Sequence, residues 1–144
     1  MPNFTEQLQC IVGDNATVGL VIVDHGSRRQ QSNALLDEVV AMFKQTTGAT
    51  LVEPAHMELA EPSIATAFDR CVEQGADWVV VFPYFLSPGR HWHADIPQLA
   101  AEAAAKHPGV RHLVTAPLGL HEGMASIMQD RMTHCLSRVL GQAD

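Results

Sequence analysis

Residues 18–27 read VGLVIVDHGS, and they set the pattern that the rest of the chain follows. The first six are apolar and mostly β-branched, which predicts a buried strand over residues 18–23. The next four, DHGS, combine a glycine with short polar residues and are typical of a turn. Leu35, Val39, Met42 and Phe43 then recur at helical spacing, and Gly48 is a natural stop. The stretch therefore predicts a strand, a tight turn and a helix.

Strand and helix patterns alternate along the chain. Three further strands are predicted over residues 51–57, 78–82 and 110–116, of which residues 78–82 (WVVVF) are the clearest. The helix that follows WVVVF is predicted to begin with Asp95 as its N-cap and Pro97 in its first turn. Such alternation implies right-handed crossovers, which place helices on both faces of a parallel sheet. We therefore predict an α/β fold with a small four-stranded parallel sheet, as one domain over residues 18–144 after an N-terminal extension over residues 1–17.

Two features of the helices bear on packing. The last helix carries Met128, Met132, Leu136 and Leu140 on one side. This apolar side can pack either on the chain's own sheet or against a second copy. Cys71 and Cys135 lie in apolar helical stretches and are predicted to be small buried hydrophobes. With Cys10 they form no C-x-x-C pair and no zinc-type spacing.

Composition and charge exclude several classes of protein. The 144 residues are 47% hydrophobic and 17% charged, as expected of a globular domain. The net charge of −7 argues against nucleic acid as a partner. No apolar run approaches the roughly 20 residues of a membrane span, and the start, MPNFTEQLQC, is unlike a signal peptide. We expect a soluble, cytoplasmic protein. Neither phosphate-binding glycine motif occurs, so a nucleotide cofactor is not indicated.

Histidines gather at the predicted carboxyl ends of the strands, where open parallel sheets bind their ligands. Five of the eight map there: His25, His56, His91, His93 and His121. Taken singly, each can be a solvated or backbone-bonded loop histidine, and their clustering is what favours a site. Glu58 lies two residues after His56, so on a strand both side chains would point to the same face and Glu58 would reach the edge near His25. A solvated strand-end carboxylate is an equal alternative for Glu58.

These residue types suit metal or proton chemistry on an anionic ligand. Two histidines and one carboxylate can bind a divalent cation while leaving positions open, and the same groups can accept protons. Arg28 and Arg29 lie near the predicted start of the first helix, whose N-terminus already favours anions. With Arg90 they supply a local positive patch on an otherwise acidic chain.

Three motifs in order resemble the short class II tetrapyrrole chelatases, the sirohydrochlorin cobalt- and iron-inserting enzymes. Residues 24–28 (DHGSR) are similar to the opening motif of that family, and residues 57–64 (MELAEPSI) to its second motif. The third is matched by FPYFL at 82–86, GRH at 89–91 and DIP at 95–97. The order and spacing fit over roughly residues 18–140.

The resemblance implies an ATP-independent chelatase with a flavodoxin-like half-fold that works as a homodimer. Its metal-handling histidines would be His25 and His91, and its acidic residue Glu58. Their catalytic work would be to present a divalent metal (cobalt, iron or nickel) or to accept the macrocycle's protons, and which histidine does which stays open. Peripheral carboxylates of the tetrapyrrole would be held by four further residues: Ser27, Arg28, Ser87 and Arg90.

The chain departs from the family pattern at three places. Residues 1–17 extend beyond the usual short form, His93 is an additional histidine, and Glu122 stands where a proline is expected. The cysteine-bearing tails of some relatives are absent, so no iron–sulfur cluster is predicted. None of these differences removes a candidate catalytic group.

Two other functions fit the same residues. A tetrapyrrole or metal carrier of the same fold would use the same groups without turnover. A metal-dependent hydrolase could use His25, Glu58 and His91 around zinc, although the sequence shows neither a clear third ligand nor a nucleophile motif.

Overall fold

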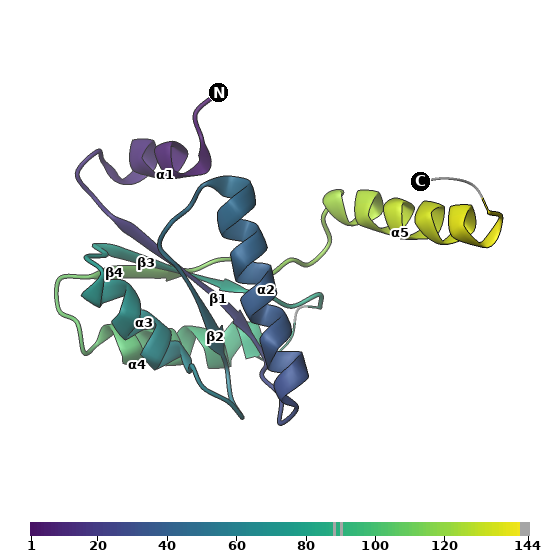
Figure 1. Ribbon diagram of the computed structural model, residues 1–144. Coiled ribbons are helices and arrows are strands. Elements are labelled where there is room, and N and C mark those ends of the chain that lie inside the picture. Colours follow the sequence, from purple (N-terminus) through teal and green to yellow (C-terminus); the bar gives the residue numbers. More distant parts are fainter. Residues whose placement is uncertain (88, 90, 142–144) are drawn as a thin grey trace.

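Four parallel strands form one sheet in the order β2-β1-β3-β4 (Figure 1). The strands are β1 (Val18–Asp24), β2 (Val52–His56), β3 (Trp78–Pro83) and β4 (Arg111–Val114). This computed structural model describes residues 1–87, 89 and 91–141, and for residues 91 and 92 the backbone only. The predicted small parallel sheet is confirmed.

The central strand is apolar on both faces because helices cover both. Alternate residues of β1 belong to two separate clusters: Val21 and Val23 to one, Leu20 and Ile22 to the other. The sequence of a strand that is buried on both sides is expected to be apolar at nearly every position, which explains the run VGLVIV. Pairing of β1 with β2 and β3 leaves its carboxyl end in the middle of the sheet edge.

Helices pack on both faces, as the sequence predicted. Helix α2 (Gln30–Thr47) buries Leu36 and Val40 against one face. Helices α3 (Ile64–Glu73) and α4 (Ile96–Ala104) cover the other, with Phe68 fully buried between them and the sheet. The buried face of α2 differs from the apolar face that was predicted, because Leu35 and Met42 belong to the predicted face but are largely exposed.

Cys71 fits the space that a glycine leaves on β1. A side-chain carbon at Gly19 would lie 2.8 Å from the Cβ of Cys71. Burial, aided by the charge of Glu53, raises the pKa of the Cys71 thiol to about 12. Its predicted burial is confirmed. The same prediction is wrong for Cys135, which is exposed because its helix leaves the body of the molecule.

The N-terminal segment contains a helix, α1 (Phe4–Val12), which was not among the elements predicted from the sequence. Asn3 and Glu6 form a capping box at its start. The ring of Phe4 meets Phe43 of α2 edge to face, with centroids 5.8 Å apart. This contact attaches the extension to the α2 side of the sheet.

The segment before α4 differs from the prediction. A short π-helical segment, η1 (His91–Asp95), runs directly into α4. Asp95 stands at the N-cap position of α4 with Pro97 in the first turn, as predicted, but it has helical backbone angles and makes no side-chain capping hydrogen bond. Because the helical chain continues back to His91, no free N-terminus exists at Ile96 for a side chain to cap.

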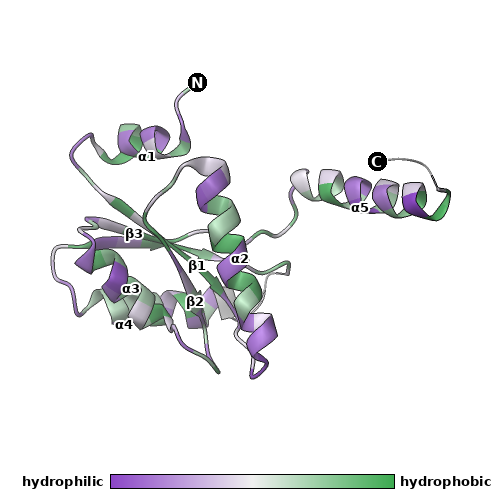
Figure 2. Ribbon diagram, viewed as in Figure 1, coloured by the Kyte–Doolittle hydropathy of each residue, from purple (hydrophilic) through white to green (hydrophobic). Residues whose placement is uncertain are grey.

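The last helix, α5 (Gly123–Val139), projects away from the sheet (Figure 1). Polar and apolar residues alternate along it (Figure 2), and none of its residues is buried. In this structure the body of the helix is not packed on the chain's own sheet. Within the described residues, no helix is long and apolar enough to cross a membrane.

An apolar groove of about 680 Å³ lies where the sheet is left uncovered beside α2. The strands contribute Val80 and Phe82, α2 contributes Met42 and Phe43, and the first turn of α5 contributes Met124, among other residues. Met42, exposed on α2, is thus part of an apolar surface that continues onto the sheet.

Candidate active site

Backbone pairing between β1 and β2 continues past the ends of both strands. Asp24 and His56 are register partners at the two strand ends. The N–H of Met57 then donates to the carbonyl of Asp24 at 2.8 Å, and that of Glu58 to the carbonyl of His25 at 3.1 Å. The loops that carry His25 and Glu58 are therefore joined to one another.

His25 and Glu58 meet side chain to side chain. Nε2 of His25 lies 3.0 Å from Oε1 of Glu58, and both side chains are about half exposed. Nδ1 of His25 is 3.2 Å from the carbonyl oxygen of Gly26. A neutral imidazole has one N–H and can donate to only one of these two acceptors, which leaves the other nitrogen with a lone pair. The pair can therefore accept a proton or offer a nitrogen to a cation.

Gly26 allows this close approach. Its φ of +92° is accessible to glycine, and a side-chain carbon there would lie 1.9 Å from the carbonyl oxygen of Glu58. It would also lie 3.1 Å from the Cβ of His56. The glycine of the DHGSR motif is thus required by packing between the two loops.

Ser27 is fixed by a residue that sequence reasoning missed. The side-chain Nδ2 of Asn33 in α2 donates to the carbonyl of Ser27 at 2.7 Å, and its Oδ1 accepts from the N–H of Ser27 at 2.9 Å. The hydroxyl of Ser27 accepts from the N–H of Arg29 at 3.0 Å and still has a hydrogen to donate. An asparagine in the first turn of a predicted helix is a signal for such a contact.

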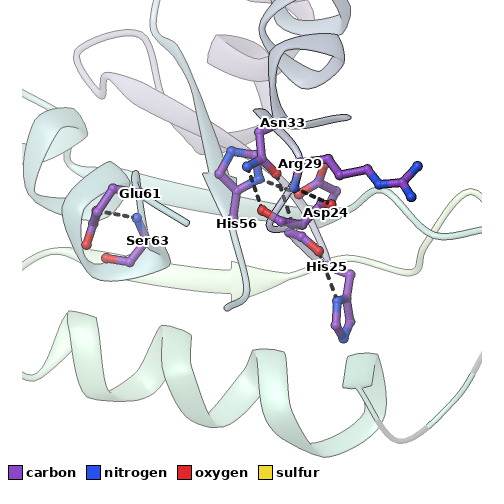
Figure 3. Close-up of polar contacts among 9 residues, drawn as sticks. Asp24, His25, Arg29, Asn33, His56, Glu61 and Ser63 are labelled. Atoms are coloured by element: carbon purple, nitrogen blue, oxygen red, sulfur yellow. Dashed lines mark hydrogen bonds and ion pairs between the residues drawn. The ribbon is translucent and has the colours of Figure 1, made fainter. Parts of the chain in front are cut away.

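His56 lies beneath this surface and does not share a face with Glu58. It is 2% exposed, and its Nδ1 is 2.6 Å from Oδ1 of Asp24. Figure 3 shows these two side chains facing one another, while the His25 ring points away from them. The predicted common face is wrong because β2 ends at His56, after which the chain turns through Leu59 at a φ of +71°.

Glu61 serves the fold at this edge. Its carboxylate accepts from the N–H of Ser63 at 2.7 Å (Figure 3). It also accepts from the hydroxyl of Thr66 at 3.0 Å. Ser63 is the N-cap of α3, and its hydroxyl accepts from the N–H of Thr66 at 3.1 Å. The two glutamates of MELAEPSI therefore have different surroundings: Glu58 contacts His25, whereas Glu61 is held at the helix start.

The remaining predicted residues are only partly placed. Arg28 and Ser87 are exposed. Arg90 and the side chain of His91 lie outside the described part of the chain. His93 is exposed, and the exposed His121 accepts from the N–H of Gly123 at 2.9 Å, at the start of α5.

Metal-ligating groups do not form a complete set within residues 1–87, 89 and 91–141. No three side chains of histidine, cysteine, aspartate or glutamate lie together there as a group that could hold an ion. The contact between His25 and Glu58 supplies two potential ligands, and the side chain of His91 lies outside the described part of the chain.

Fold and site together define an open α/β protein with a histidine–carboxylate pair at the carboxyl edge of its sheet. The family profile CbiX matches residues 19–135. The chain belongs to the CbiX family.

Three proteins illustrate the likeness. The chain is 60% identical, over 88% of its length, to the chloroplastic sirohydrochlorin ferrochelatase of Arabidopsis thaliana, of which it covers 56%. It is 31% identical to the sirohydrochlorin chelatase SirB of Bacillus subtilis subspecies spizizenii, solved in complex with cobalt. The TM-score is 0.75, and the match covers 82% of this chain and 50% of that one.

The third is smaller. A putative cobalamin biosynthesis CbiX protein from Marinobacter aquaeolei VT8 is 28% identical with a TM-score of 0.70, and the match covers 85% of this chain and 99% of that one. By contrast, the chain spans about half the length of several of the curated relatives it matches.

Proposed function

We propose that the chain inserts a divalent metal into sirohydrochlorin or a related acidic tetrapyrrole, without ATP. The observation that carries the proposal is the contact of 3.0 Å between His25 and Glu58 at the carboxyl edge of the sheet. Membership of the CbiX family and the likeness to named sirohydrochlorin chelatases support the same reaction. The metal is a substrate of this reaction. Iron and cobalt are both candidates, because one relative is named a ferrochelatase and another was solved in complex with cobalt. Nickel is a third candidate.

Metal insertion requires a proton acceptor close to a nitrogen ligand. The macrocycle loses two N–H protons while the cation loses bound water. His25 would accept a proton or bind the cation when substrate is present, and Glu58 would balance the positive charge that builds on the imidazole when it takes a proton. By its resemblance to the family motif, His91 serves as the second metal-handling histidine.

Positive charge and N–H groups at the edge fit an anionic substrate. Arg28 precedes α2, whose N-terminus favours anions. The hydroxyl of Ser27, held in place by Asn33, can donate to a carboxylate. Ser87 and Arg90 are proposed to contact the same carboxylates from the loop after β3.

We also propose that the chain works as a homodimer. A macrocycle has two faces, and a single sheet edge offers groups to only one of them. The α5 of one copy would occupy the apolar groove of the other, which would cover both the groove and the exposed Met128, Met132 and Leu136.

For cofactors and compartment, our proposal follows the sequence. The protein would use neither a nucleotide nor an iron–sulfur cluster, and would have no nucleic-acid or membrane partner. The proposed compartment is the cytoplasm. The word chloroplastic in the name of the Arabidopsis relative makes a plastid the alternative, and a fluorescent fusion of the full coding sequence would distinguish them.

Anaerobic incubation with sirohydrochlorin and Co²⁺, Fe²⁺ or Ni²⁺ in turn tests the function. We expect the absorption spectrum to change at a rate proportional to protein concentration, with many turnovers per chain. A single stoichiometric change would identify a carrier, and a rate equal to the protein-free rate would contradict the proposal.

A further inference from the structure

A buried polar pair lies directly beneath the candidate site, and the proposed reaction leaves it without a role. Among the described residues, His56 is the only polar or charged residue classed as fully buried. Its partner Asp24 is 23% exposed, and their side chains meet at 2.6 Å. An ionised carboxylate only accepts hydrogen bonds, so Nδ1 of His56 carries the donated hydrogen.

Stability alone does not account for this pair. Burying a histidine against a mostly buried carboxylate removes much of their polar surface from water, and apolar residues of similar size commonly stabilise a fold at least as well. In the described part of the chain, Nε2 of His56 has no hydrogen-bond partner, so the ring is satisfied at one nitrogen only. The position of the pair is the more informative feature.

The pair joins the two strand ends from which the site is built. Asp24 precedes His25 in sequence, and His56 lies two residues before Glu58. The backbone contacts from Met57 to Asp24 and from Glu58 to His25 continue the same alignment. The Cβ of His56 also limits the space at Gly26. A displacement of the His56 ring would therefore move both loops.

We propose that Asp24 and His56 are positioning residues, which hold the β1 and β2 loops so that His25 and Glu58 stay in contact. This inference rests on the proposed function. Groups that support reacting side chains typically change activity by about 10- to 100-fold when removed, because small displacements are costly in a reacting geometry.

The chain contains a matched control. His107 and Asp69 form a second histidine–aspartate contact, also at 2.6 Å. It joins α3 to the segment between α4 and β4, which lies at the amino end of β4 and so at the opposite edge of the sheet. His107 also stacks on Phe68, with ring centroids 5.8 Å apart. Its loss should affect stability without affecting the site.

The test compares His56→Leu, His56→Asn and His107→Leu in the full chain. We expect His56→Leu to lower kcat by about 10- to 100-fold with the KM for sirohydrochlorin within about twofold. Asparagine places an N–H where Nδ1–H lies, so His56→Asn should recover most of kcat. His107→Leu should keep kcat within about twofold while lowering the melting temperature. The proposal would be overturned if His107→Leu lost as much kcat as His56→Leu, or if the kcat of each variant fell only in proportion to its loss of melting temperature.

A second measurement is independent of turnover. The ring ¹H–¹⁵N signals of His25, assigned with His25→Gln, should shift in His56→Leu and stay unchanged in His107→Leu. Unchanged His25 signals in the folded His56→Leu protein would overturn the proposal. Asp24→Asn replaces His56→Leu if the latter does not fold. A wild-type protein without insertion activity would contradict the proposed function, while the His25 signals would still decide the positioning role.

Discussion

At Gly26 the backbone of the loop after β1 passes so close to the carbonyl of Glu58 that no side chain fits between them. Gly26→Ala should therefore separate the two loops, in addition to the cost of a positive φ, which is about 1–2 kcal/mol for alanine. Gly48→Ala is the control, since Gly48 has a φ of +77° and nothing within 4 Å of an added carbon. We expect both variants to lower the melting temperature and only Gly26→Ala to lose insertion activity. Equal activity in the two variants would contradict the close-approach argument.

The two glutamates of residues 57–64 offer a second comparison at the residue scale. Glu58→Gln removes the charge beside His25 and should lower kcat by about 100-fold or more, the range of general acid–base contributions. Glu61→Gln weakens the start of α3 and should cost about 1 kcal/mol of stability with kcat retained. Circular dichroism and initial rates on the same samples measure both effects. A kcat loss confined to Glu61→Gln would reverse the two assignments.

Sequence reasoning reached some of these residues and missed others for a physical reason. The meeting of His25 with Glu58 follows from parallel strands, whose carboxyl ends share an edge. The Asp24–His56 contact was missed because a histidine at a strand end gives no sign of being buried. Asn33 was missed because its contact with Ser27 depends on how the loop turns into α2, which the periodicity of the helix does not report.

At the scale of the element, α2 presents its N-terminus to the site and its C-terminus to the opposite side of the molecule. Arg28 just before the helix should bind substrate carboxylate, so Arg28→Ala should raise the KM for sirohydrochlorin about 10-fold, with kcat nearly unchanged. Lys44→Ala removes a charge from the last turn of the same helix and should leave both constants unchanged. Steady-state rates over a range of sirohydrochlorin concentrations give the answer. A fall in kcat at constant KM would place Arg28 in the chemistry.

The elements themselves could be predicted where their pattern is strong. VGLVIV and WVVVF are too apolar and β-branched to lie anywhere except in buried strands. Helix α1 was missed because it is only nine residues long and buries none of them completely. The start of α4 at Ile96 agrees with the prediction, whereas the π-helical segment before it was missed because Asp95 and Pro97 resemble an isolated helix beginning.

At the scale of the whole molecule, the position of α5 could not be predicted from the sequence, because an amphipathic helix does not specify which apolar surface it covers. The described chain has an uncovered groove on the sheet and a helix with no buried residue. Both would be covered if two copies exchanged their helices. Homodimers commonly use one self-complementary surface in this way.

The helix-exchange arrangement makes a prediction about assembly. Leu136→Asp and Met132→Asp place charge on the side of α5 that would enter the partner's groove, and Phe82→Asp places it in the groove itself. We expect the wild-type chain to sediment as a dimer at micromolar concentration, and each variant to shift towards monomer, because an unpaired buried charge is costly. Arg131→Asp on the same helix is the control: it also puts a negative charge on α5, but at a position already charged. Insertion activity should fall together with the dimer fraction. A wild-type monomer with full activity would contradict both the exchange of α5 and the need for a second face on the macrocycle.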